Sequence, residues 1–303
     1  MIVVNPRARK GRGHELIDEA VERLVVRGLQ PVLVTGTDPA DATERARHHS
    51  RRSVRAVVAA GGDGMVRIVG QGVAGTSTPF GVLPIGTGND YVRALGLPTD
   101  PVEAADVIAD GHVRPVDAGI SDGQWWQTIA CAGFDSRVSE RANTMGWPRG
   151  HLRYDLATVL ELAAMRPYRF RMVVDGLDTT FDALFVAVGN THTYGGGMKV
   201  CPDASPFDGQ LSVTVVGPMS RLTFARMMPM VKTNPTMSHP MIARFPAREL
   251  SLDLAEEGPG GPHGRGNPAE LIAFADGDPI GPLPMRFAVV PGAIQLLCPR
   301  DPA

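Results

Sequence analysis

Hydrophobic positions divide the chain into two halves with different periodicities. In the first half, short apolar runs predict buried strands at Ile2–Val4, Pro31–Val34, Val54–Ala60 and Phe80–Leu83. Helical segments lie between and after these runs, at Gly13–Arg27, Pro39–Ser50, Met65–Val73, Asp90–Leu95 and Pro101–Ala109. Asp38 is a suitable N-cap for the second of these helices, and Gly111 is expected to end the last one. This alternation predicts an α/β domain in which helices cover both faces of a parallel sheet.

After Asp117 the pattern changes to strands that are separated by turns. The strand-like segments are Trp125–Ala132, Tyr168–Asp175, Phe181–Gly189, Leu211–Val216, Glu249–Leu254, Leu271–Asp276, Arg286–Val290 and Ile294–Cys298. Two helical insertions interrupt them, at His151–Met165 and near Arg221–Met230. The second half is therefore predicted to form an antiparallel β-sandwich. We divide the chain into a first domain over residues 1–117 and a second domain over residues 118–303.

Two glycine-rich loops follow successive strands of the first half. Gly-Gly-Asp-Gly at residues 61–64 follows Val54–Ala60, and Pro-Ile-Gly-Thr-Gly-Asn-Asp at residues 84–90 follows Phe80–Leu83. Each loop places bare backbone N–H groups and a helix N-terminus at the carboxyl end of a strand, where a phosphate can bind. Asp63 inside the first loop would repel that phosphate unless a cation lay between them. The two loops together therefore predict a site for a metal–nucleotide complex.

Composition narrows the range of functions. The 303 residues carry a net charge of -2, so the chain lacks the overall basic field that is typical of nucleic-acid binding. Cys131, Cys201 and Cys298 lie far apart and form no Cys-x-x-Cys pair, which fits a reducing cytoplasm rather than a disulfide framework or a zinc site. No apolar run approaches the ~18 residues that a transmembrane helix needs, so any contact with a membrane is expected to be peripheral.

The motifs resemble the diacylglycerol kinase catalytic family, bacterial soluble lipid kinases that are related to sphingosine and ceramide kinases. The resemblance covers nearly the whole chain, and the actinobacterial members look most similar. It is carried by Asn5-Pro6, the two glycine loops, Gly195-Gly196-Gly197, Pro-Asp-Ala-Ser-Pro-Phe-Asp-Gly at residues 202–209, and Asp276-Gly277-Asp278. NAD kinases share the Gly-Gly-Asp-Gly loop, whereas the Gly-Thr-Gly-Asn-Asp loop is typical of the lipid kinases. The resemblance implies a nucleotide site in the cleft between the two domains, with residues 1–117 binding the nucleotide and residues 118–303 the lipid.

The resemblance also implies which residues hold the nucleotide and its metal. The matching nucleotide positions are Asn5, Pro6, Thr35, Gly62, Asp63, Gly64, Gly86, Thr87, Gly88 and Asn89. Thr37 takes the place of Thr35 if the match shifts by two residues. Asp63 and Asp117 are expected to position the magnesium of ATP through water, because a hard dication prefers carboxylate and water oxygens.

A second, structural magnesium ion is implied by the segment around Asp208. Asp208 resembles a ligand of this ion, and the backbone carbonyls of Ser205 and Gln210 complete the protein's share of the coordination. The local sequence taken alone favours a different explanation, an Asp-Gly hairpin turn.

Asp276 is the candidate general base. It ends an apolar strand and precedes Gly277, so its carboxylate can protrude and accept the proton of an alcohol that attacks the γ-phosphate. Asp278 is the second candidate; the family usually has glutamate there, and a tight turn is the alternative explanation. The segment after the first glycine loop also departs from the family, because Met65, Arg67 and Ile68 replace threonine, asparagine and glutamate. These departures leave the identity of the acceptor open.

The sequence predicts an ATP- and magnesium-dependent lipid kinase that phosphorylates diacylglycerol to give phosphatidic acid. The alternatives are a kinase for another lipid alcohol (a sphingoid base or another acylglycerol), an NAD kinase, or a nucleotide-binding regulator without catalysis. Met227, Met228 and Met230 would line an acyl-chain groove or touch membrane, although ordinary packing is the simpler explanation. We expect a cytoplasmic protein, monomeric or homodimeric, that associates peripherally with the inner face of the membrane.

Overall fold

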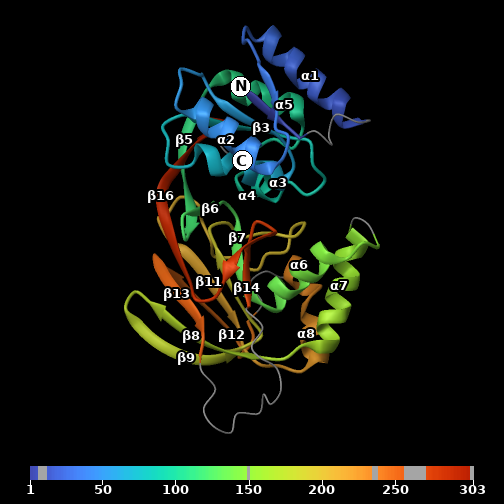
Figure 1. Cartoon of the computed structure of the whole chain (residues 1–303), viewed down its shortest axis with the longest axis vertical. Helices are drawn as coiled ribbons and strands as arrows, with labels where there is room; N and C mark the ends of the chain where they lie inside the picture. Colours follow the sequence, from blue (N-terminus) through green and yellow to red (C-terminus); the bar gives the residue numbers. More distant parts are fainter. Residues whose placement is uncertain (6–11, 149–150, 234–237, 256–270, 301–303) are drawn as a thin grey trace.

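The protein consists of two bodies stacked along its long axis (Figure 1). The computed structural model describes residues 1–5, 12–148, 151–233, 238–255 and 271–300. An α/β body contains the N-terminal strands, and a β-rich body with a pair of long helices at its side lies next to it (Figure 1). None of the described helices is long and apolar enough to cross a membrane.

The first domain is built on a parallel sheet with helices on both faces, as predicted. Its strands are β1 (Ile2–Val4), β2 (Leu33–Thr35), β3 (Val57–Gly61) and β4 (Pro79–Pro84), in the order β2-β1-β3-β4. Its helices are α1 (Arg12–Val26), α2 (Pro39–Ser50), α3 (Asp63–Val73), α4 (Asp90–Ala94) and α5 (Pro101–Asp110). Apolar residues of α1 and α5 form one core with the sheet, and those of α2, α3 and α4 form a separate core on the opposite face.

Local signals fix the ends of two of these helices. The Asp38 side chain accepts a hydrogen bond from the backbone N–H of Asp41 at 2.9 Å, and Pro39 is the first residue of α2. Asp100 caps α5 in the same way, and Gly111 ends that helix in the left-handed conformation with φ +74°. The predictions for Asp38 and Gly111 are therefore confirmed.

The second domain is a sandwich of two sheets. Its strands are β5 (Val113–Ser121), β6 (Gln124–Trp126), β7 (Ile129–Gly133), β8 (Tyr168–Val174), β9 (Leu177–Ala183), β10 (Phe185–Gly189), β11 (Leu211–Val216), β12 (Ile242–Ala247), β13 (Glu249–Leu254), β14 (Ile272–Ala275), β15 (Asp278–Pro282) and β16 (Met285–Leu297). One sheet has the order β12-β11-β10-β7-β14-β15 and is antiparallel throughout. It packs against β8, β13 and the first part of β16, with Phe170, Leu252 and Phe287 meeting Val188 and Val213 in a shared core.

Strand β16 joins the two domains. It pairs antiparallel with β13 and β5 and then parallel with β4, so Ile294 and Leu296 lie in the core of the first domain. Figure 1 shows this strand running from the β-rich body into the α/β body. The sequence predicted two strands, Arg286–Val290 and Ile294–Cys298, in the second domain alone. The structure has one strand with an irregularity between Val290 and Ile294, and its second half extends the first domain's sheet.

Four helices accompany the sandwich in the described residues. They are α6 (Phe134–Thr144), α7 (His151–Ala164), α8 (Arg221–Met227) and α9 (Met230–Thr233). Helices α6 and α7 lie side by side next to the sheet (Figure 1). The sequence predicted α7 and α8 but missed α6, whose mostly polar residues bury only Phe134, Ser136 and Ala142. Such a helix has too narrow an apolar stripe to stand out by periodicity.

Candidate active site

The two glycine loops lie against each other at the carboxyl ends of β3 and β4. The backbone N–H of Ile85 donates to the carbonyl of Gly61 at 3.0 Å. A Cβ atom added to Gly86 would collide with the Cα atom of Gly62, and one added to Gly88 would lie 2.8 Å from Oδ2 of Asp63. The close approach of the two loops therefore requires glycine at residue 86 and leaves little room for a side chain at residue 88. Gly64 and Thr87 are exposed.

Asp63 links the two loops. It is the first residue of α3, and its Oδ1 atom accepts a hydrogen bond at 3.1 Å from the backbone N–H of Tyr91 in α4. The positive end of the α3 dipole stabilises a carboxylate at this position. Asp63 is therefore more than a residue that stabilises its own turn, because it fixes the spacing of the two helices that follow the loops.

Asn89 and Asp90 end the second loop with different partners. Asn89 adopts a left-handed conformation with φ 54°, and its Nδ2 atom donates to the carbonyl of Gly86 at 2.8 Å. Its Oδ1 atom is buried and has no hydrogen-bond partner among the described residues. The buried carboxylate of Asp90 accepts the backbone N–H groups of Gly196 at 2.7 Å and Gly197 at 2.8 Å. Asp90 thereby attaches the glycine loop of the second domain to the first, a contact that the sequence analysis did not find.

Thr35 ends strand β2 at the same carboxyl end of the parallel sheet as the glycine loops, because it pairs with Val4, which pairs with Ala60. Its Oγ1 atom is buried and has no hydrogen-bond partner within the described part of the chain. Thr37 instead serves its own turn, because its N–H and hydroxyl both bond to the side chain of Asp41. Of the two threonines, Thr35 is thus the one with an unused hydroxyl. Asn5 follows β1 directly, while Pro6 lies outside the described residues.

Asp117 is a buried junction between three segments. Its Oδ1 atom accepts the N–H of Gly292 at 2.8 Å, and its Oδ2 atom accepts the N–H of Gly209 at 2.7 Å. Its own N–H donates to the carbonyl of Pro206 at 2.9 Å, and the side chain of Asn190 donates to its carbonyl. The carboxylate thus ties the loop that contains Asp208 to β16 and β5. Its role beside magnesium stays a prediction.

The three residues predicted for a structural ion come together in space. Ser205, Asp208 and Gln210 line a cavity of 270 Å³, together with Asp203 and Arg244. Oδ1 of Asp208 accepts the N–H of Gln210 at 2.9 Å, which closes the local turn. The described residues contain no cluster of three or more His, Cys, Asp or Glu side chains that could hold a metal. A site made of one carboxylate and two backbone carbonyls stays a prediction.

Asp276 lies in the turn between β14 and β15, next to Gly277. Both residues are left-handed, with φ 52° for Asp276 and φ 86° for Gly277. The carboxylate accepts three hydrogen bonds, from the N–H of Gln127 at 2.8 Å, the N–H of Thr128 at 2.7 Å and the hydroxyl of Thr128 at 2.5 Å. Burial raises the pKa of Asp276, and these hydrogen bonds together with the positive charge of Arg67 oppose that rise without cancelling it.

Residues of both domains surround Asp276. Burial raises the pKa of Tyr91 in α4, and the negative charge of Asp276 adds to this effect, which places the phenol near the carboxylate. The hydroxyl of Tyr91, both side-chain polar atoms of Gln127, and Oδ1 of Asn190 are buried without a hydrogen-bond partner in the ranges that the structure describes. Buried polar atoms are normally paired, so this concentration of unpaired donors and acceptors is typical of a site that binds a polar ligand.

Asp278 pairs with Arg67 across the domain boundary. Nη1 of Arg67, in α3, lies 2.8 Å from Oδ2 of Asp278, in β15. Tyr154 of α7 also lies near Asp278. Burial raises the pKa of Tyr154, and the negative charge of Asp278 adds to this rise. The other two departures from the family pattern have a structural explanation: Met65 is buried in the first domain's core, and Ile68 packs against that core. Met65 also lies against the first glycine loop, because a Cβ atom added to Gly61 would come within 2.4 Å of its Cγ atom.

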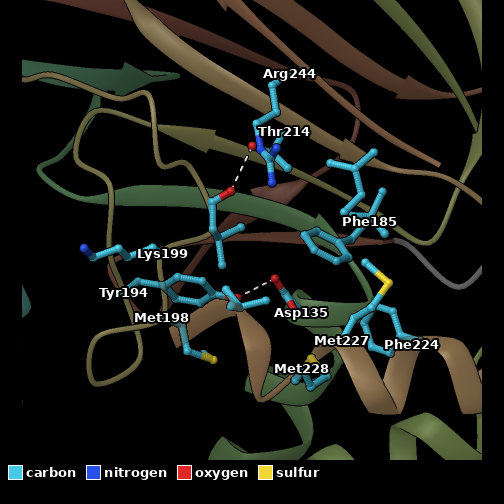
Figure 2. A pocket seen from close by; sticks show the side chains of 14 residues that line it. Asp135, Phe185, Tyr194, Met198, Lys199, Thr214, Phe224, Met227, Met228 and Arg244 are labelled. Atoms are coloured by element: carbon cyan, nitrogen blue, oxygen red, sulfur yellow. Dashed lines mark hydrogen bonds between the residues drawn. The ribbon is translucent and has the colours of Figure 1, made fainter. Parts of the chain in front are cut away.

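An apolar cavity lies beside α8 in the second domain (Figure 2). Met227 and Met228 line it, together with Phe185 and Phe224, whereas Met230 is exposed. Asp135 enters this cavity and accepts a hydrogen bond from the hydroxyl of Tyr194 (Figure 2). Burial raises the pKa of Asp135 to about 6, although the bond from Tyr194 opposes the rise.

Comparisons with known proteins agree with this arrangement. Residues 1–120 match the diacylglycerol kinase catalytic domain, and residues 128–298 match the YegS C-terminal NAD kinase beta sandwich-like domain. A Mycobacterium tuberculosis protein named diacylglycerol kinase is 37% identical over 98% of this chain and 94% of its own length. A Bacillus subtilis protein of the same name is 26% identical over 100% of this chain and 97% of its own length.

A solved structure of a Bacillus anthracis protein has the same fold. It covers 100% of this chain and 97% of that chain with a TM-score of 0.79 and 22% sequence identity. The solved structure shows that the fold is shared, and the two matched domains together with the identity to the mycobacterial protein show the family. This chain belongs to the diacylglycerol kinase family.

Proposed function

We propose that the protein transfers the γ-phosphate of ATP directly to the hydroxyl of diacylglycerol and so forms phosphatidic acid. The observation that carries this proposal is Asp276, whose carboxylate is held by Gln127 and Thr128 of the second domain and faces Arg67 and Tyr91 of the first. A carboxylate at the meeting point of the domains can take the proton of an alcohol while the glycine loops hold the nucleotide. Its raised pKa makes it a stronger base than an ordinary exposed aspartate.

We place the nucleotide between the two domains, with its phosphates on the paired glycine loops. Gly62, Gly86 and Gly88 keep backbone free of side chains there, and the N-termini of α3 and α4 start at the loops. The unused hydroxyl of Thr35 and the unused Oδ1 atom of Asn89 are available to polar groups of the same ligand. This unused hydroxyl favours Thr35 over Thr37 as a nucleotide-binding residue, because the N–H and hydroxyl of Thr37 already bond to Asp41.

Magnesium fits the carboxylates of this arrangement. Asp63 would hold it, because its Oδ2 atom lies at the contact of the two loops, 2.8 Å from the position that a Cβ atom on residue 88 would take. The oxygens of Asp117 already accept backbone N–H groups, but each keeps a lone pair for a water molecule. When bound, the ion would neutralise phosphate charge. We assign the structural ion to Asp208 and the carbonyls of Ser205 and Gln210.

The lipid is proposed to reach Asp276 from the side of the second domain. Met227 and Met228 give the cavity beside α8 a flexible apolar lining that suits acyl chains. Trp147, which precedes α7, and Leu152, in its first turn, are exposed, and Tyr154 of the same helix approaches Asp278. We therefore propose a cytoplasmic enzyme that meets its substrate at the inner face of the membrane.

Transfer of labelled γ-phosphate tests the proposal. The wild-type protein should label diacylglycerol in mixed micelles with magnesium, but not NAD. Asp63→Asn should bind ATP poorly and lose turnover while it keeps the fold, because asparagine can still accept the hydrogen bond from Tyr91. ATP binding without transfer to any lipid would support the regulator instead and contradict the enzyme.

The packing of Met65 and Ile68 is compatible with the enzyme and with the regulator alike, so the choice between the two rests on the residues of the reaction. Both departures from the family pattern are absorbed by packing in the first domain's core. The residues that the reaction requires, Asp63 and Asp276, keep side-chain contacts that join separate elements.

A further inference from the structure

Arg67 occupies a special position in the proposed kinase site. It lies four residues after Asp63 in α3, so the two side chains share one face of the helix. Its Nη1 atom pairs with Oδ2 of Asp278 at 2.8 Å, and its side chain is 16% exposed while that of Asp278 is 47% exposed. The ion pair therefore holds a largely buried guanidinium next to the turn that carries Asp276.

The guanidinium retains an unused donor. The Nε atom of Arg67 is buried and has no hydrogen-bond partner among residues that the structure describes. Gln127 lies on the same side of α3, since its side-chain amide packs against Gly70, and both of its polar atoms also lack partners in the described ranges. Leaving a charged donor and an amide unpaired in the interior is costly, so a polar ligand group is expected to complete them.

Arg67 is also close to the reacting atoms. Its positive charge acts on Asp276, against the larger effect of burial, to lower the pKa of that carboxyl. The acceptor hydroxyl must touch Asp276 to lose its proton. Whatever group the lipid carries on the carbon next to that hydroxyl consequently lies in the neighbourhood of Arg67.

We propose that Arg67 is a specificity-determining residue that selects a neutral ester and rejects an ammonium group beside the reacting hydroxyl. In diacylglycerol the neighbouring carbon bears an ester, whose carbonyl oxygen can accept the N–H of Arg67. In a sphingoid base that carbon bears an ammonium group, which the guanidinium repels. Arg67 also pairs with Asp278, so this carboxylate is not available to pair with the ammonium group. This inference rests on the proposed lipid kinase function.

Three acceptor lipids test whether a charge on the carbon next to the reacting hydroxyl decides which lipid is phosphorylated. They are diacylglycerol, sphinganine, and N-acyl sphinganine, in which an uncharged amide replaces the ammonium. The wild type should use diacylglycerol best and should use sphinganine at least about 10-fold less well than its N-acyl derivative. Arg67→Gln should lower kcat/KM for diacylglycerol about 10-fold and raise the ratio of sphinganine to N-acyl sphinganine about 10-fold. Arg67→Lys keeps the charge and should leave that ratio low.

Controls distinguish this role from a structural one. Arg171→Gln removes an exposed arginine that pairs with Asp178 across the β8–β9 hairpin of the second domain, and should change neither acceptor ratio nor rate. Arg67→Gln should also move the acid limb of the kcat/KM profile for diacylglycerol to higher pH, since Arg67 lowers the pKa of Asp276. Loss of packing alone would not move this limb.

The outcomes are separable from those of the proposed function. No transfer to any of the three lipids by the wild type would overturn the kinase itself. An active wild type that uses sphinganine as well as its N-acyl derivative would overturn only the role of Arg67. An unchanged ratio in Arg67→Gln would do the same, and if that variant does not fold, a raised ratio in Arg67→Lys would contradict a role for the charge.

Discussion

Three Asp-Gly turns of the second domain share one backbone shape and differ in their surroundings. Asp122, Asp175 and Asp276 have φ values of 46°, 47° and 52°, and each is followed by a left-handed glycine. Asp122 and Asp175 are exposed in hairpins, whereas Asp276 is partly buried and accepts three hydrogen bonds from Gln127 and Thr128. The turn explains why aspartate is followed by glycine, and the contacts explain why only one of these turns suits catalysis.

The largest difference between these turns is expected when asparagine replaces the aspartate of two of them and so removes its charge. Asp276→Asn should lower kcat about 1,000-fold, because the neutral amide cannot take a proton from the acceptor. Asp175→Asn should stay within about 2-fold of the wild type, as expected for a change on an exposed surface. Asparagine tolerates the left-handed conformation, so Asp175→Asn should melt like the wild type. Asp276→Asn should lose about 1–3 kcal/mol of stability, because its amide NH2 faces a backbone N–H of Gln127 or Thr128 that the carboxylate accepts, so kcat is compared at a temperature at which both variants are folded. Steady-state kinetics with diacylglycerol and thermal melting measure both effects, and equal losses would refute the special status of Asp276.

The glycine loops allow the same comparison within the first domain. Gly86→Ala should destabilise the fold by about 3 kcal/mol, because its Cβ would collide with the backbone of Gly62. If the two loops move apart to relieve the collision, the free energy of ATP binding should weaken by a similar amount instead. Gly64→Ala meets nothing within 4 Å and should cost less than about 1 kcal/mol. Urea unfolding with and without nucleotide gives both numbers. Similar costs would mean that the loops do not pack as described.

Asp135 is a second buried carboxylate, which accepts a hydrogen bond from Tyr194, whereas Asp276 accepts three hydrogen bonds. The Asp135 pKa of about 6 exceeds that of an unfolded aspartate, so the folded state holds the proton over a pH range in which the unfolded state has lost it. The free energy of unfolding should therefore fall by up to about 3 kcal/mol as pH rises from 4 to 7. Asp135→Asn removes this term and still accepts the bond from Tyr194. Urea unfolding at the two pH values should show a weaker pH dependence in the variant, and an equal dependence would contradict the assignment.

The smallest effect concerns the glycines of the turns. Gly176→Ala and Gly277→Ala should each cost about 1 kcal/mol of stability, because both glycines are left-handed and neither added Cβ meets an atom within 4 Å. Only Gly277→Ala should also lower kcat, since it shifts the neighbouring Asp276. Chemical unfolding and kinetics on the same preparations decide this. A loss of kcat in Gly176→Ala would show that such losses reflect stability alone.

Local patterns predicted what depends on neighbouring residues. The strands before the glycine loops, the helix ends at Asp38 and Gly111, and the end of the apolar strand at Asp276 all follow from residues within a few positions. The sequence could not predict pairs formed by residues far apart in the chain. Asp90 with Gly196 and Gly197, and Arg67 with Asp278, exist only because the two domains meet.

Strand β16 has a consequence for how the protein is made. Strands β1 to β4 leave the ribosome first, yet one edge of β4 is covered only when β16 pairs with it. Until then the nascent chain exposes an open strand edge next to the segment that carries the second glycine loop, and such edges invite aggregation. A chaperone that covers this edge until the second half has been synthesised should therefore raise the yield of folded protein.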